Sequence, residues 1–134
     1  MYAFRVIVAA LFAITTSASV VERQLGGIGC NIARFQILGA LGDAGDAISQ
    51  IQDTDVQAAA QAGLDQANGG ISQIASSILS GAAAPAESRD EVAAGLAAMD
   101  SALADADESD AAVGDAKTAL ADATAAGQDV VAKC

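Results

Sequence analysis

The chain has 134 residues, a formal net charge of −11 at neutral pH, and neither histidine nor tryptophan. Without histidine it has no Ser–His or Cys–His pair and no imidazole metal ligand, which excludes the common routes of nucleophilic and zinc catalysis. The negative charge disfavours nucleic acid and anionic membranes as partners. We therefore expect a protein that is not an enzyme and that needs no cofactor.

The first residues show the three parts of a secretory signal peptide. Arg5 precedes an unbroken apolar run at 6–14, and small residues follow. The run is shorter than the about 20 residues that a membrane-spanning helix needs. We expect residues 1–18 to be removed by a cut after Ala18. A cut after Ser19 and a buried N-terminal helix are the alternatives.

A short propeptide at 19–23 is a second expectation. Arg23 precedes Gln24 in a junction that resembles the propeptide ends of secreted fungal proteins, although an ordinary exposed arginine explains it equally well. No later apolar stretch predicts an anchor, and no Asn begins a glycosylation sequon. We expect a secreted, extracellular product, released freely or associated with a cell wall.

The chain from Gln24 onwards is long enough for one domain. It holds four basic and sixteen acidic residues, so its net charge is −12, and Phe35 is its only aromatic residue. Such an acidic surface is usually simply solvated, but it also tolerates a cationic protein partner.

Four segments space their apolar residues as amphipathic helices do. They cover about residues 31–52, 55–79, 87–106 and 110–132. The second segment keeps its phase across Asn68-Gly69-Gly70, where local rules predict a turn. We expect one long helix there, with a split into two helices as the alternative.

The connections carry capping and breaking residues. Acidic residues at 53–55 and 107–110 predict helix caps, and the only proline, Pro85, lies in a linker at 80–86. The acids at 105–110 lack the central glycine and the spacing of a calcium loop, so we expect no metal site there.

Cys30 and Cys134 predict a disulfide, because an exported chain with an even pair of cysteines matures under oxidising conditions. In an up-down-up-down bundle the first helix starts at the end where the fourth helix finishes. The two cysteines occupy these two positions. The sequence therefore predicts a small all-α four-helix bundle, up-down-up-down, closed by one disulfide.

Apolar side chains are the candidate ligand contacts, because amphipathic helices can house an apolar ligand or lie on a hydrophobic surface. The second helix, with its isoleucines beyond the glycines, is the favoured segment. The alternative is that these side chains only form the core. The candidate contacts are Phe35, Ile48, Ile71, Ile74, Ile78, Leu96 and Met99.

The leader, the propeptide-like junction and the helical Ala/Ser/Asp-rich body with in-phase Ile, Leu and Val resemble the secreted hydrophobic surface-binding and cell-wall galactomannoprotein family of filamentous fungi. The resemblance implies adhesion to hydrophobic surfaces or sequestration of fatty acids. The chain is short for that family and lacks a Ser/Thr-rich tail. We expect a hydrophobic surface or a lipid as the target. The alternative is an interaction module or effector whose acidic surface meets a cationic partner.

Overall fold

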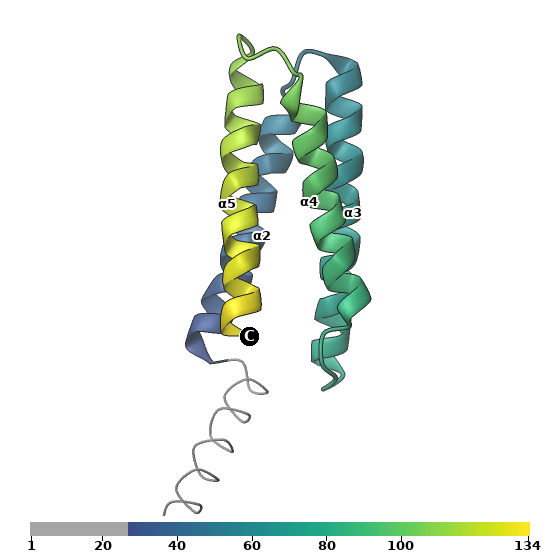
Figure 1. Cartoon of the computed structure of the whole chain (residues 1–134), viewed down its shortest axis with the longest axis vertical. Coiled ribbons are helices and arrows are strands. Elements are labelled where there is room, and N and C mark those ends of the chain that lie inside the picture. The colour runs from purple at the N-terminus through teal and green to yellow at the C-terminus, as the bar shows by residue number, and fades with distance from the viewer. Residues whose placement is uncertain (1–26) are drawn as a thin grey trace, which may run out of the picture.

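The computed structural model describes residues 27–134, which form four α-helices along one long axis (Figure 1). The helices are α2 (Ile28–Ile48), α3 (Thr54–Leu79), α4 (Ala86–Ala104) and α5 (Ala111–Lys133). Consecutive helices run antiparallel, and a disulfide joins Cys30 to Cys134. The expected four-helix bundle is confirmed. The predicted signal peptide at 1–18, the cut after Ala18, and the propeptide at 19–23 with its Arg23 lie outside the described residues.

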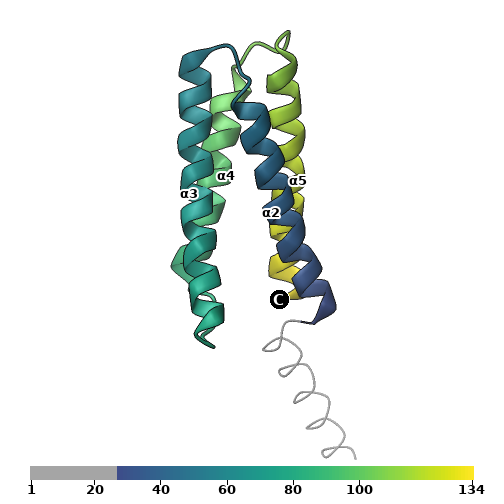
Figure 2. The same ribbon diagram turned by 180° about the vertical axis from the view of Figure 1, so that it is seen from behind.

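The four helices are arranged as two pairs. Helix α2 packs mainly against α5 and α3 mainly against α4, whereas the contacts between the pairs are few. The pairs meet at the loop end, which carries the α2–α3 connection at 49–53 and the α4–α5 connection at 105–110. They diverge toward the open end, where α2 starts, α5 finishes and the α3–α4 connection lies (Figures 1 and 2).

Glycines set the close packing of α3 against α4. A Cβ atom on Gly95 of α4 would lie 2.5 Å from the Ala67 nitrogen and 2.6 Å from the Gly63 oxygen of α3. A Cβ atom on Gly70 would lie 2.6 Å from the Ser88 oxygen. Only glycine permits such an approach of two backbones. Helix α3 continues without a break through Asn68-Gly69-Gly70, as expected. The packing of Gly70 against α4 stabilises the helical conformation there over the turn that local rules predict.

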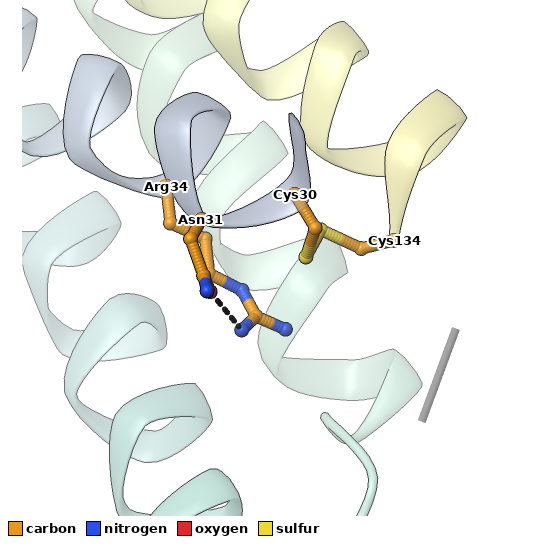
Figure 3. The surroundings of a disulfide bond; sticks show 4 residues. All are labelled: Cys30, Asn31, Arg34 and Cys134. Atoms are coloured by element: carbon orange, nitrogen blue, oxygen red, sulfur yellow. Dashed lines mark hydrogen bonds between the residues drawn. A yellow bond between two sulfur atoms is a disulfide. The ribbon is translucent and has the colours of Figure 1, made fainter. Parts of the chain in front are cut away.

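The α2/α5 pair is closed by the disulfide at the open end (Figure 3). The Cα atoms of Cys30 and Cys134 lie 5.0 Å apart, and Cys30 is buried. Alanine dominates the buried faces of both helices along the rest of the pair. These alanines are Ala33, Ala40, Ala44 and Ala47 on α2, and Ala116, Ala119, Ala123 and Ala126 on α5.

Side-chain caps and a left-handed glycine determine where several helices begin and end. Asp53 caps α3 by accepting hydrogen bonds from two backbone N–H groups of its first turn, and Asp110 caps α5 by accepting one, from Ala112 N–H. Gly81, with φ of 79°, ends α3 in a Schellman motif, in which Ala82 N–H donates to the Ser77 carbonyl.

The first helix differs most from its predicted limits. It begins at Ile28 instead of about residue 31 and ends at Ile48 instead of about residue 52. Beyond Ile48 the backbone tightens, since Ile51 N–H bonds to the Ile48 carbonyl three residues before it. This turn keeps Ile51 buried although it lies outside the helix.

Candidate functional site: an apolar end opposite an acidic end

Exposed large apolar side chains gather toward the open end of the molecule. We call residues 27–38, 67–96 and 122–134 the open half, and residues 39–66 and 97–121 the loop half. All the large hydrophobic side chains that are exposed within the described residues belong to the open half. They are Ile28, Ile32, Phe35, Leu38, Leu79 and Val131.

Four of these side chains form a stripe along the first turns of α2. Ile28, Ile32, Phe35 and Leu38 follow steps of four, three and three residues, which places them on neighbouring positions of one side of a helix. The opposite side of the same turns carries the buried residues Cys30, Ala33 and Ile37. The α2 stripe, as we call these four residues, therefore faces away from the α2/α5 packing, and Phe35 is 71% exposed.

The seven predicted ligand contacts fall into three groups. Phe35 lies in the α2 stripe. Ile71, Ile74 and Ile78 on α3 and Leu96 on α4 are half-buried in the open half. Ile48 and Met99 are completely buried in the loop half, so they are core residues in the closed bundle. Five of the seven belong to the hydrophobic core cluster or pack against it, whereas Phe35 and Ile78 do not, so the seven residues do not form one exposed site.

The sequence reasoning did not select the other three members of the α2 stripe. Ile28, Ile32 and Leu38 have helical spacing with Phe35, and this spacing could have predicted that the four side chains lie on one side of the helix. It was masked by a second apolar pattern on the same helix, which includes Ile37 and belongs to the core. A helix that is apolar on two sides gives no periodicity with which to tell the core side from the exposed side.

The acidic residues are concentrated in the loop half, opposite to the exposed apolar side chains. The loop half holds eleven acidic residues and one basic residue, Lys117, whereas the open half holds five acidic and three basic residues. Net charges of −10 and −2 follow for the two halves. Between Ile28 and Gly42 the only charged residue of α2 is Arg34, so the turns of α2 that carry the stripe have no carboxylate, and the two acids of this helix, Asp43 and Asp46, lie in the loop half.

The basic residues near the stripe are held by neighbours on their own helices. Arg34 donates to the Asn31 side chain at 3.4 Å, close to the disulfide (Figure 3). Lys133 forms an ion pair with Asp129 at 2.8 Å, one turn away on α5. Both contacts lie at the surface, where such pairs contribute little to stability. The ion pair compensates the charge of Lys133, whereas Arg34 keeps its positive charge because Asn31 is neutral.

The loop end has a shallow cavity of about 210 Å³ between the two interhelical connections. Five of its seven lining residues are polar or acidic, and none of them is a predicted ligand contact. The lining residues are Gln52, Asp53, Ala106, Asp107, Ser109, Asp110 and Val113. Only Ala106 and Val113 contribute apolar side chains to it, whereas a lipid tail requires a mostly apolar lining.

The acids at the loop end are engaged in turns and caps. Asp107 accepts a hydrogen bond from Ser109 N–H at 2.9 Å, and this bond lowers the pKa of the Asp107 carboxyl below its ordinary value of 3.8. Asp110 accepts from Ala112 N–H and, across the cavity, from Gln52 N–H. Within residues 27–134 no group of three or more acidic or cysteine side chains is arranged to hold a metal ion.

Comparison with models of protein families, with curated proteins and with solved structures gives no significant match to this chain. The class of protein is therefore defined by its own structure, as an all-α four-helix bundle with one disulfide. In the part of the chain that the structure describes, no helix has the length and apolar character that crossing a membrane requires.

Proposed function

We propose that this protein is secreted and that, without being an enzyme, it binds a hydrophobic surface or an apolar ligand such as a lipid through its open end. The observation that carries the proposal is the position of the exposed large apolar side chains, which all lie in the open half, away from the acidic loop end. Contiguous exposed apolar surface rimmed by polar residues is typical of interaction sites.

An extended surface fits this geometry better than an enclosed ligand. The α2 stripe faces outwards, and its four side chains follow one side of a helix that a flat apolar surface can meet along its length. The cavity at the loop end is polar and lies at the opposite end from the stripe. The charge distribution favours an uncharged surface, with the acidic loop end left in water.

The resemblance to secreted fungal hydrophobic surface-binding and cell-wall proteins agrees with this proposal. Secretion would place the cysteines in a compartment where their disulfide persists. Mass spectrometry of the exported protein tests the secretion step. A mature chain that begins at Ser19 or Gln24 supports it, and an intact Met1 in the exported protein contradicts it.

Adsorption to unmodified polystyrene beads tests the function directly, together with titration by a fluorescent fatty acid. Substituting Phe35→Gln should weaken adsorption by roughly tenfold to a hundredfold, because burying a large apolar side chain contributes about 1.5–3 kcal/mol. The matched control is Ala59→Gln on an exposed site of α3 in the loop half, which should bind as the native protein does. Saturable binding to neither target, or equal losses in both variants, contradicts the proposal.

A cationic protein partner is the second candidate function, and the net charge of −10 on the loop half favours it. Salt separates the two candidates. Association through exposed charges weakens steeply between low and physiological ionic strength, whereas apolar adsorption does not. Pull-down with a basic protein and bead adsorption, both measured across this salt range, decide which end of the molecule binds.

A further inference from the structure

We propose that on an apolar surface the two helix pairs separate as intact units, turning about the loop end. The side chains between the pairs at the open end then join the α2 stripe in contacting the surface. This inference rests on the proposed function and adds the conformational change by which binding proceeds. It gives Ile71, Ile74, Ile78 and Leu96, which are half-buried in the closed bundle, a role as a second contact surface.

The covalent links between the pairs all lie at one end. The chain passes from one pair to the other only at 49–53 and 105–110, which are both at the loop end. The α3–α4 connection at the open end joins two helices of the same pair, and so does the Cys30–Cys134 disulfide. Within residues 27–134 no covalent bond therefore holds the two pairs together at the open end.

The packing between the pairs, like the covalent links, is concentrated at the loop end. Four of the largest fully buried side chains, Ile48, Met99, Leu103 and Val113, lie in the loop half. Toward the open end the pairs diverge (Figure 2), and the three isoleucines at the end of α3 are only half-buried. Separation at this end gives up little burial, while an apolar surface can cover the same side chains.

Each pair has its own means of staying together. The α3/α4 pair has backbones in contact at Gly63 and Gly95, and its buried Ser88 hydroxyl donates to Gln73 at 2.9 Å. The α2/α5 pair has its alanine-lined faces and the disulfide. The contacts within each pair far exceed those between pairs, so an opening motion should divide the molecule between the pairs.

The loop end has the features of a hinge. Gln52 N–H of one connection donates to the Asp110 carboxylate of the other at 2.9 Å, which ties the two crossings together. The same carboxylate caps α5. The connections can therefore turn together while α3 and α5, which start at this end, keep their capped first turns.

Distances between spin labels test the inference. The double variant Gln36→Cys/Ser76→Cys carries nitroxides on α2 and α3, one on each pair. The matched control Gln36→Cys/Gln128→Cys carries them on α2 and α5 of one pair, and Ser76→Cys/Ala93→Cys reports on the other. All four sites are exposed in the open half. Labelling without reductant preserves the native disulfide.

The distances are measured by pulsed electron paramagnetic resonance in solution and on polystyrene beads, and adsorption of each sample is measured in parallel. We expect the distance between the pairs to lengthen on the beads by about 10 Å, the width of a helix. The two distances within pairs should stay unchanged. Adsorption with an unchanged distance between the pairs overturns the inference but leaves the proposed function in place.

Two other results also count against the inference. Lengthening of the distances within pairs shows general unfolding instead of separation into pairs, and failure of every sample to adsorb overturns the proposed function together with the inference. As a second measurement, a bismaleimide spacer can link Gln36→Cys to Ser76→Cys in solution. The linked protein should adsorb about tenfold more weakly, whereas a link between Gln36→Cys and Gln128→Cys should change nothing.

Discussion

Glycine has two different roles in these helices, and only the environment of each residue separates them. Gly95 lies where α4 touches the backbone of α3, so it has no room for a side chain. Gly39 on α2 has nothing within 4 Å of the position that a Cβ atom would take. The first glycine permits packing, and the second costs the helix conformational entropy without a packing gain.

Substituting Gly95→Ala should therefore destabilise the protein by about 1–3 kcal/mol, because the added methyl group meets backbone atoms that cannot move aside easily. Gly39→Ala should stabilise it by about 0.5–1 kcal/mol. Urea unfolding of both variants, followed by circular dichroism, measures the two effects. Equal changes in both variants would show that the α3–α4 seam is looser than described.

Asp107 gives a prediction about pH. Its carboxylate accepts the Ser109 N–H bond, so its pKa is lowered in the folded protein. A lowered pKa means that the stabilisation is present above the ordinary value of 3.8 and is lost as the pH falls below it, through the folded pKa. Carbon-detected NMR titration should find the Asp107 midpoint below 3.8 in native protein. A midpoint at or above that value contradicts the Asp107–Ser109 bond.

At the scale of the elements, Asp110 both caps a helix and connects the two interhelical connections by a hydrogen bond. Its carboxylate caps α5 and accepts Gln52 N–H from the α2–α3 connection, whereas Asp53 caps α3 through two amides of its own helix. Each aspartate begins a long helix at the loop end and accepts two backbone hydrogen bonds, but only Asp110 accepts one from the other connection. They allow the value of the link between connections to be separated from that of a cap.

Asp53→Ala should cost about 1 kcal/mol, the usual value of a helix cap. Asp110→Ala should cost more, about 1–2 kcal/mol, because one of the two hydrogen bonds that it removes joins the two connections. Thermal or urea unfolding of the two variants provides the comparison. An Asp110→Ala variant no less stable than Asp53→Ala would show that the link contributes nothing.

The whole molecule combines a well-packed loop end with a more loosely packed open end. Half of its buried hydrophobic residues are alanines, which bury little apolar area each, and most of the largest buried side chains lie in the loop half. The disulfide acts at the other end, where it secures the α2/α5 pair. Stability should therefore be distributed unevenly along the long axis.

Replacing both cysteines, as Cys30→Ser/Cys134→Ser, should lower the stability by about 2–5 kcal/mol, the usual cost of losing a native disulfide from a small domain. Hydrogen exchange should show the loss first in the starting turns of α2 and the last turns of α5. The amides near Gly63 and Gly95 should remain the most protected against exchange in this variant. Uniform loss of protection across all four helices would contradict separate behaviour of the two pairs.

The number of helices, their order and the disulfide could all be predicted from the chain, because each depends on local patterns or on the position of the ends. Breakers separate four periodic segments, and cysteines lie at the start of the first helix and just after the last. Even the continuity of α3 through Asn68-Gly69-Gly70 was readable from the phase of its apolar residues. Aspartates before α3 and α5 indicated the caps in the same way.

The sequence by itself therefore determined the class of fold, its closure and the absence of histidine chemistry. The tertiary structure decided which helices form pairs, that Ile48 and Met99 are core residues, and that the α2 stripe is exposed. The reason is physical. Periodicity shows that a helix has an apolar side, but only the neighbouring helices decide whether that side is covered. In a chain rich in alanine and glycine, several pairings of helices satisfy the same pattern.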